Sequence, residues 1–313
     1  MDRMSREPGL SHDEGRYRMT RSVAPLLLVF ALTLTSYAQV SHGVVKEGLT
    51  IDSKILNKKV RYTIYLPFDY ESSSRVYPVV YLLHGYTDND MGWIQFGEAN
   101  LIADEGIAKR EIPPMIIVMP DAGASWYINN YNGSVRYEDF FIQEFMPWIE
   151  SHYRIRQERR YHGVAGLSMG GFGTLVYAMR HPDLFAACAA LSAGVHTMQQ
   201  FVKTDDRAWT SSWPITVYGP GSGEARLTEH LLSYSPINIV ETYDPEKLKS
   251  VRIYLDCGDD DIFTIGNSML HVALTQKQIP HEYRVRDGSH IWSYWRSGLT
   301  DALKFIGSSF HQP

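Results

Sequence analysis

The sequence predicts an α/β fold in which a mostly parallel sheet is covered by helices on both faces. Continuous apolar runs are typical of strands that are buried on both sides. Segments with the apolar spacing of helices separate most of these runs, and parallel sheets are built from alternating strands and helices. The predicted strands are Val79–Leu83, Met115–Met119, His162–Ala165, Ala186–Leu191 and Val251–Leu255.

The remaining elements extend this sheet at both ends and cover it. Gly48–Ile55 and Lys59–Leu66 alternate apolar and polar residues, which predicts an antiparallel pair before the first buried strand. A last strand is expected at His281–Val285. Helices are expected at Glu138–Tyr153, Gly171–Arg180, Ile262–Gln276 and about Trp292–Phe310.

One long segment departs from this rhythm. Residues 194–248 form an insertion between two strands, with Trp209, Trp213 and a glycine-rich stretch at 219–223. A loop of this length inside a compact domain is usually a lid or a binding element. We therefore expect a single domain over residues 39–313 that carries a lid-like insertion.

The composition excludes several classes of protein. Of the 313 residues, 44% are hydrophobic and 21% are charged, as in an ordinary globular protein. The formal net charge is −5 and no run of five like charges occurs, so we expect no nucleic-acid partner. No motif implies a metal or an organic cofactor, and we expect none.

The N-terminus has the pattern of a signal peptide. Ala24–Leu34 is an uncharged apolar run of 11 residues, too short to span a bilayer, and it follows Arg21. Residues 36–38 then place small side chains where a signal peptidase cleaves. A buried core helix fits this position and these flanks less well. We predict cleavage between Ala38 and Gln39 and a secreted or periplasmic protein without a membrane anchor.

The first 18 residues do not fit the positively charged start of a signal peptide. They contain four acidic residues and four arginines. We therefore expect translation to start at Met19.

The two cysteines are expected to be buried free thiols. Cys188 is early in its strand, whereas Cys257 closes another. If the two strands are parallel neighbours, an offset of several residues at about 3.3 Å each separates the thiols too far for a disulfide.

The stretch GLSMGG at residues 166–171 lies between a predicted strand and a predicted helix. This is the G-x-S-x-G pattern of a nucleophile elbow, in which Gly166 and Gly170 leave room where a Cβ would clash. Ser168 is therefore a candidate nucleophile. The alternative is a glycine-rich turn that happens to contain a serine, and partner residues must decide.

A serine nucleophile needs a base, and a histidine base needs a group that fixes its tautomer. His290 follows the last strand in a glycine-containing loop. Asp259, Asp260 and Asp261 all follow Gly258 at a strand end, and any of them can face His290. The acids also fit a solvated turn or a helix N-cap. Their spacing does not fit a calcium loop, which needs alternating acids and a distal glutamate.

The loop that begins at His84 follows a strand at the place where oxyanion-stabilising donors are found. One backbone N–H is expected from this loop and a second from Met169, directly after the candidate nucleophile. His84 is interpreted as a brace for the loop and not as a second base.

Five motifs together resemble the putative-esterase group of α/β-hydrolases, which includes esterase D, feruloyl and acetyl-xylan esterases and the mycolyltransferases. The resemblance covers roughly residues 42–310. It implies an α/β-hydrolase fold, a triad of Ser168, Asp261 and His290, and an oxyanion hole formed by the N–H groups of Tyr86 and Met169. The 194–248 insertion carries no motif that matches one substrate. The motifs, in order, are HGYTDND, VMPDAG, GLSMGG, CGDDD and DGSHIWSYW.

These observations favour a secreted serine carboxylesterase that acts on feruloyl or acetyl esters of plant polysaccharide, because a polymer is met outside the cell. Trp126, Trp209 and Trp213 are candidates to stack on a phenolic or sugar ring. An S-formylglutathione-type thioester hydrolase fits the signal peptide less well, since that substrate is cytosolic. Acyl transfer to a sugar is a further alternative. A non-enzymatic binding module is disfavoured because no triad residue is missing.

Overall fold

The computed structural model describes residues 42–310 and contains one eight-stranded sheet with the order β1-β2-β4-β3-β5-β6-β7-β8. β1 pairs antiparallel with β2, β2 pairs antiparallel with β4, and every other pair is parallel. The predicted α/β fold with a mostly parallel sheet is confirmed. The strands are β1 (Val44–Ser53), β2 (Lys58–Leu66), β3 (Val79–Leu83), β4 (Ile116–Pro120), β5 (His162–Leu167), β6 (Ala187–Leu191), β7 (Arg252–Gly258) and β8 (His281–Arg286).

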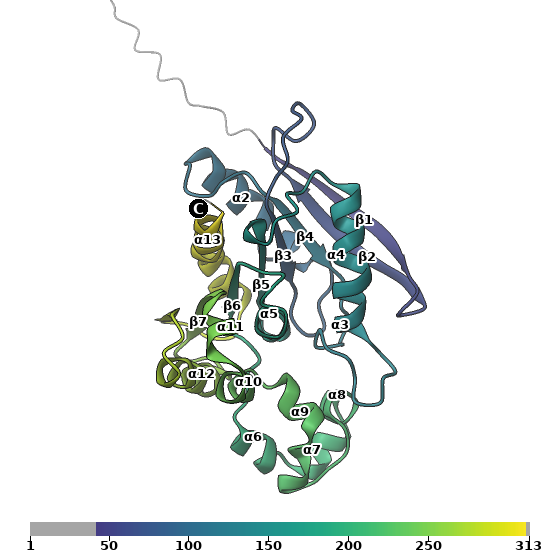
Figure 1. Ribbon diagram of the computed structural model, residues 1–313, viewed down its shortest axis with the longest axis vertical. Coiled ribbons are helices and arrows are strands. Elements are labelled where there is room, and N and C mark those ends of the chain that lie inside the picture. The colour runs from purple at the N-terminus through teal and green to yellow at the C-terminus, as the bar shows by residue number, and fades with distance from the viewer. Residues whose placement is uncertain (1–41, 311–313) are drawn as a thin grey trace, which may run out of the picture. The chain divides into compact units, whose positions relative to one another are not determined.

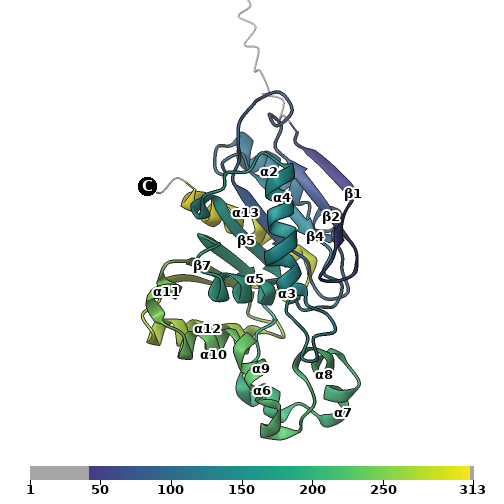
Figure 2. The ribbon, with the colours of Figure 1, turned by 45° about the vertical axis from the view of Figure 1, so that its right-hand side comes forward.

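Helices cover both faces of this sheet (Figures 1 and 2). On one face lie α4 (Met146–His152), α5 (Met169–Arg180) and α12 (Thr264–Gln276); on the other lie α2 (Ala99–Ala108) and α13 (Trp292–Ser309). Side chains of a strand point alternately to the two faces, so every residue of a central strand needs an apolar neighbour. This double burial is the reason that the central strands are apolar, apart from His162 at the start of β5.

The segment between β4 and β5 is one helical stretch, close to the predicted Glu138–Tyr153. It begins as α3 (Tyr137–Phe140), passes through a π-helical turn at Phe141–Phe145 and continues as α4. A shorter helix, α1 (Gly92–Gln95), precedes α2.

The 194–248 insertion is mostly helical and not a loop, which corrects the expectation from its length. Most of its helices begin at a side chain that accepts a backbone N–H, for example Thr197, Asp205 and Thr228. Helices this short lack the repeated apolar spacing that a sequence reading detects. They are α6 (Met198–Lys203), α7 (Asp206–Thr210), α8 (Trp213–Tyr218), a 3₁₀ turn (Gly223–Arg226), α9 (Glu229–Tyr234), α10 (Pro236–Thr242) and α11 (Pro245–Lys249).

A buried arginine organises the first half of the insertion. The guanidinium of Arg226 is fully buried and lies 4.6 Å above the Trp209 ring. It donates to the carbonyl oxygens of Phe201 at 3.0 Å and Gly221 at 3.2 Å, and it pairs with Asp206. Because one side chain satisfies acceptors from several turns, these short helices hold together as a unit.

Glu138 joins the insertion to the rest of the domain. Its buried carboxylate accepts hydrogen bonds from Arg180 Nε at 2.8 Å, His181 Nε2 at 2.9 Å and the Tyr234 hydroxyl at 2.7 Å. Arg180 also donates to the Ser233 carbonyl at 3.0 Å. Burial opposes ionisation, but the hydrogen bonds from His181 and Arg180 outweigh it and lower the pKa of Glu138 to about 2.

The two thiols are free and buried, as predicted. Cys188 on β6 lies opposite Ile253 on β7, four residues before Cys257. Within residues 42–310, no helix is both long and apolar enough to cross a membrane. The predicted signal peptide, residues 1–38, lies outside the described residues.

Candidate active site

Ser168 occupies a sharp turn between β5 and α5. Its backbone angles, φ 55° and ψ −118°, are rare for a residue with a side chain and cluster at functional sites. A Cβ on Gly170 would lie 2.3 Å from the Leu83 carbonyl oxygen, and one on Gly166 would lie 2.5 Å from the Gly170 oxygen. The two glycines therefore permit the close approach that holds Ser168 at the carboxyl end of the sheet.

Ser168, His290 and Asp261 form a chain of hydrogen bonds. The Ser168 Oγ lies 2.8 Å from His290 Nε2, and His290 Nδ1 lies 2.9 Å from Asp261 Oδ2 and 3.1 Å from Oδ1. The three residues come from the loops that follow β5, β8 and β7. This geometry suits a serine whose proton is taken by an oriented histidine.

The surroundings of Asp261 favour its ionised carboxylate form. Burial raises the pKa of its carboxyl group, but the hydrogen bonds from His290 and from the Phe263 N–H outweigh that effect and bring the pKa below its ordinary value. The Phe263 N–H lies 2.8 Å from Oδ1. α12 begins at Thr264, so Asp261 does not occupy the N-cap position that the sequence left open.

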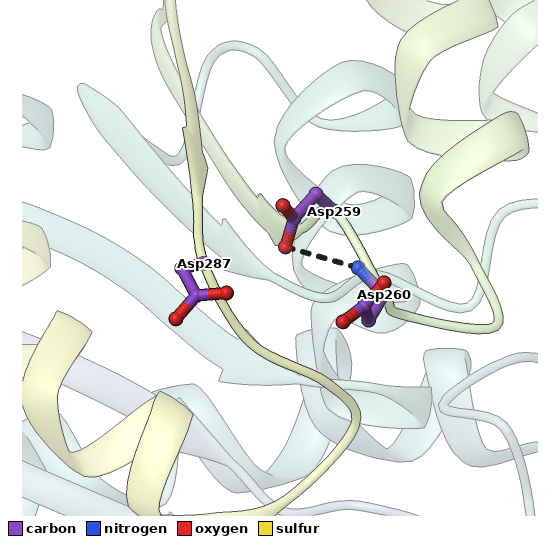
Figure 3. A group of neighbouring side chains, drawn as sticks. All are labelled: Asp259, Asp260 and Asp287. Atoms are coloured by element: carbon purple, nitrogen blue, oxygen red, sulfur yellow. Dashed lines mark hydrogen bonds between the residues drawn. The ribbon is translucent and has the colours of Figure 1, made fainter.

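The other two acids of the triplet, Asp259 and Asp260, are exposed and lie near Asp287 (Figure 3). Asp259 accepts hydrogen bonds from the N–H groups of Asp260 at 3.1 Å and Gly288 at 3.0 Å. Oxygen atoms of Asp259, Asp260 and Asp287 lie within 4.8 Å of one another, and all three residues are exposed. The structure thus brings Asp261 alone of the three to His290.

The N–H groups of Tyr86 and Met169 are available to a ligand. Met169 is the first residue of α5, so its N–H has no partner within the helix. Among the hydrogen bonds of residues 42–310, none uses the backbone N–H of either residue. Tyr86 and Ser168 line the same cavity. The two predicted donors therefore lie beside the candidate nucleophile.

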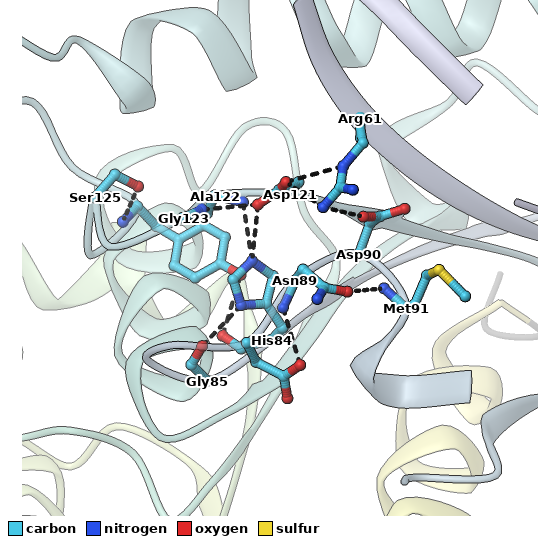
Figure 4. Close-up of polar contacts among 12 residues, drawn as sticks. Arg61, His84, Gly85, Asn89, Asp90, Met91, Asp121, Ala122, Gly123 and Ser125 are labelled. Carbon is cyan, nitrogen blue, oxygen red and sulfur yellow. Dashed lines mark hydrogen bonds and ion pairs between the residues drawn. The ribbon is translucent and has the colours of Figure 1, made fainter. Parts of the chain in front are cut away.

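His84 fixes the loop that carries Tyr86 (Figure 4). Its Nε2 accepts the Ala122 N–H at 2.9 Å, so the ring proton is on Nδ1 and is donated to the Gly85 carbonyl at 2.7 Å. The Gly85 carbonyl and the Tyr86 N–H belong to one planar peptide group and point in opposite directions. His84 therefore sets the direction of the Tyr86 N–H, in agreement with its interpretation as a brace.

Arg61 on β2 supports the same two loops (Figure 4). Its guanidinium lies 3.1 Å from Asp121 in the loop after β4 and 3.4 Å from Asp90 in the loop after β3. Thr63 donates to Asp90 at 2.8 Å. The loop after β3 is thus tied to β2 through Asp90.

A cavity of about 1000 Å³ opens over Ser168 and His290. Aromatic rings in its wall pack against one another. The ring centroids of Trp126 and Trp213 are stacked 3.9 Å apart, and those of His290 and Trp295 lie edge to face at 4.8 Å. Such a wall suits a planar, mostly apolar ligand. The aromatic residues that line it are Tyr86, Phe96, Trp126, Trp213, Phe263, Trp292 and Trp295.

Trp126 is held in an unusual conformation. Its φ of 56° is uncommon for a bulky residue, and Tyr127 follows with φ 62°. A Cβ on Gly194 would lie 2.8 Å from the Trp126 ring, so this glycine leaves room for the indole. The stack on Trp213 then closes the other side. Packing against Trp213 and Gly194 therefore fixes the position of the Trp126 ring.

Two of the three tryptophans that were predicted to bind substrate lie in the cavity wall. Trp126 and Trp213 line the cavity, but Trp209 does not. Trp209 is 1% exposed, donates from Nε1 to the Gly219 carbonyl at 2.9 Å and packs beneath Arg226. The prediction was wrong for Trp209 because local sequence does not show which tryptophan of the insertion forms its core.

Sequence reasoning missed other residues of the wall. Trp292 and Trp295 belong to the DGSHIWSYW motif, in which no local pattern marks them as residues of a cavity. Phe96, Phe263 and His196 come from separate loops, and only the folded chain brings them to Ser168.

A mostly parallel sheet with a serine on the strand-to-helix turn, bonded to a histidine and then to an aspartate, defines an α/β-hydrolase. The model of the putative esterase family matches residues 53–306, and the chain belongs to this family.

Individual relatives agree with this assignment. An esterase of Mycobacterium tuberculosis is 32% identical over 248 residues, which are 73% of this chain and 52% of the relative. An endo-1,4-β-xylanase/feruloyl esterase of Xylanibacter ruminicola is 31% identical over 172 residues, 51% of this chain and 23% of that protein. The chain thus spans about half the length of the Mycobacterium tuberculosis esterase. It matches 23% of the length of the xylanase/feruloyl esterase. A solved ferulic acid esterase is 35% identical with a TM-score of 0.74, covering 86% of this chain and 99% of its own.

Proposed function

We propose that this protein hydrolyses feruloyl-type esters of plant polysaccharide through an acyl-enzyme on Ser168. The observation that carries the proposal is the position of Ser168 Oγ, 2.8 Å from His290 Nε2, in a cavity with an aromatic wall. The similarity to a ferulic acid esterase and to a xylanase/feruloyl esterase supports it.

In the first half of the reaction, His290 Nε2 takes the Ser168 proton while Oγ bonds to the ester carbonyl carbon. The N–H groups of Tyr86 and Met169 stabilise the negative oxygen that develops. His290 then gives the proton to the alcohol oxygen as the carbon–oxygen bond of the ester breaks. Asp261 holds His290 in the required tautomer and stabilises its cationic form.

In the second half, water attacks the acyl-enzyme. His290 takes a proton from that water, and the same two N–H groups stabilise the second oxyanion. The bond between the acyl carbon and Ser168 Oγ then breaks, and His290 returns the proton to Oγ. The products are the free acid, the alcohol and the regenerated enzyme.

The wall of the cavity favours an aromatic acid over acetate. A phenolic acid with an unsaturated linker is flat and can lie against Trp126, Trp213 or Trp292. An acetyl group would leave most of this apolar surface in contact with water and would gain little binding free energy from it. Contacts remote from the reacting carbon can contribute to the rate when they are realised in the transition state.

We also propose that the enzyme acts outside the cytoplasm. The uncharged apolar run Ala24–Leu34 and the small residues at 36–38 support export. A polysaccharide substrate requires the same location. N-terminal sequencing of protein secreted by its host would then give a chain that starts at Gln39, and an intact N-terminus in the cytoplasm would contradict export.

The proposal is tested by kcat/KM for methyl ferulate, acetylated xylan and S-formylglutathione. We expect methyl ferulate to be the best substrate and Ser168→Ala to abolish its hydrolysis. Ser151→Ala, at an exposed serine of α4, is the matched control and should keep wild-type activity. Preference for acetylated xylan would favour the acetyl alternative, and preference for S-formylglutathione would overturn the proposed substrate class. Acylated sugar formed in the presence of a sugar acceptor would instead indicate transfer.

A further inference from the structure

His196 lies in the wall of the cavity but takes no part in the chain from Ser168 to Asp261. It stands at the start of the insertion, directly before the capping residue of α6. Aromatic rings surround its imidazole, with centroid distances of 5.2 Å to Phe201, 5.3 Å to Phe263 and 6.3 Å to Trp213. A polar ring is thus held in an aromatic enclosure beside the nucleophile.

Within residues 42–310, no side chain hydrogen-bonds to either nitrogen of His196, and the backbone of Gly194 is the group that acts on the imidazole. Nδ1 is enclosed, whereas Nε2 is not among the enclosed atoms, and the residue lines the cavity. A ligand that fills the cavity removes water from Nε2, and a polar atom that loses water without gaining a partner costs binding free energy. A group of the substrate can supply that partner.

The charge state of His196 limits what that partner can be. Burial lowers the pKa of His196 to about 4, so the imidazole is neutral at neutral pH. The three rings packed on it carry no charge that would attract an ion. A neutral imidazole presents either an N–H or a lone pair at Nε2, and a hydroxyl group pairs with both because it can accept or donate.

We propose that His196 Nε2 hydrogen-bonds a hydroxyl group of the bound ester and so determines which hydroxylated esters the enzyme prefers. This inference rests on the proposed hydrolysis at Ser168. The hydroxyl belongs either to the ring of the aromatic acid or to the alcohol, and the chemistry of recognition is the same for both sources.

The test uses two pairs of esters that differ by one hydroxyl group. Methyl 4-hydroxycinnamate with methyl cinnamate reports on the acid, and 2-hydroxyethyl cinnamate with ethyl cinnamate reports on the alcohol. His196→Phe keeps an aromatic ring in the enclosure but removes both nitrogens. We expect it to lower the ratio of kcat/KM values, hydroxylated over plain, about tenfold in one pair, which is the size of one lost hydrogen bond.

A matched histidine of the same insertion provides the control. His230 packs against the rings of Tyr131 at 5.5 Å and Tyr234 at 5.1 Å and contacts the Val217 carbonyl at 3.0 Å, but it does not line the cavity. His230→Phe should leave both ratios at their wild-type values. His196→Gln, which keeps a donor and an acceptor, should recover part of the preference.

Ratios in His196→Phe within twofold of wild type for both pairs would overturn the inference, whatever the absolute activity of the variant. An equal loss on all four esters would show that His196 only packs. Failure of the proposed function is a separate result, because it would appear as undiminished hydrolysis of methyl cinnamate by Ser168→Ala.

Discussion

The imidazole of His84 accepts the backbone N–H of Ala122 at 2.9 Å and thereby ties the loop after β3 to the loop after β4. Its other nitrogen donates to the carbonyl of the peptide group that carries the Tyr86 N–H. A residue that never touches the substrate thus orients a group that stabilises the transition state. The first two predictions follow from this relationship.

His84→Ala should lower kcat for p-nitrophenyl acetate by about a hundredfold, the order of magnitude for one lost oxyanion donor. KM should change little, because the Tyr86 N–H acts mainly on the developing oxyanion. Steady-state kinetics of both variants and of the wild type give kcat and KM. His152→Ala, at an exposed histidine of α4, is the control. A proportional change in KM with unchanged kcat would instead assign His84 to substrate binding.

The His84 brace also predicts a loss of stability in mild acid. Burial lowers the pKa of His84 from its ordinary value of 6.5. As pH falls below 6.5, the unfolded chain takes up a proton that folded His84 resists, so the free energy of unfolding decreases. Urea unfolding at pH 7.5 and pH 5 should therefore show a smaller decrease for His84→Gln than for wild type. Equal decreases would mean that His84 does not contribute to the acid sensitivity.

Asp261→Asn should lower kcat at least about a hundredfold with little change in melting temperature. Asparagine keeps an oxygen for the Phe263 N–H but favours the wrong tautomer of His290. Asp259→Asn and Asp260→Asn, both at the surface, should stay near wild type. The kinetics of the three variants on one ester give the comparison. If Asp259→Asn or Asp260→Asn shows the large loss of kcat instead, Asp261 is not the acid that orients His290.

Trp213→Ala and Trp209→Ala should behave differently. Trp213 lines the cavity, so its loss should reduce the ratio of methyl ferulate to p-nitrophenyl acetate hydrolysis by roughly tenfold, in the range of one aromatic contact. Trp209 is buried beneath Arg226, and its removal should cost about 3–5 kcal/mol of stability. Kinetics and denaturant unfolding of both variants separate the two effects. A selective change of the ratio in Trp209→Ala would contradict this assignment.

Glu138 should make the attachment of the insertion sensitive to strong acid. Its pKa is about 2 in the folded protein, against an ordinary value of 4.5, so its contribution is complete above pH 4.5 and is lost as pH falls towards 2. Glu138→Gln should lower the free energy of unfolding by about 3 kcal/mol near neutral pH, because the partly buried charge of Arg180 loses its partner. The difference from wild type should shrink below pH 4. A difference that is constant with pH would exclude an electrostatic origin.

Much of the sheet was predictable because its strands are buried on both faces. The predicted Val79–Leu83 agrees with β3 at both ends, and the other parallel strands agree to within a few residues. The same logic placed Ser168 between β5 and α5. These features depend on local sequence, in which the alternation of strand and helix is visible.

The insertion and the outer wall of the site were not predictable, since both depend on contacts between distant residues. Arg226 holds short helices together through backbone carbonyls, which leave no pattern in the sequence. Trp209 and Trp213 are four residues apart with similar neighbours, yet one forms a core and the other faces the cavity. The choice of Asp261 among three aspartates came from the resemblance to a family, and the structure supplies its geometry.

The proposed hydrolysis requires Ser168 to carry the acyl group during turnover. The most direct measurement is mass spectrometry of peptides from enzyme that has been mixed with 4-nitrophenyl ferulate and quenched in acid within the first turnover. We expect a feruloyl group on the peptide that contains Ser168 and none in Ser168→Ala. Full turnover with no adduct at Ser168, or an adduct on another residue, would contradict it.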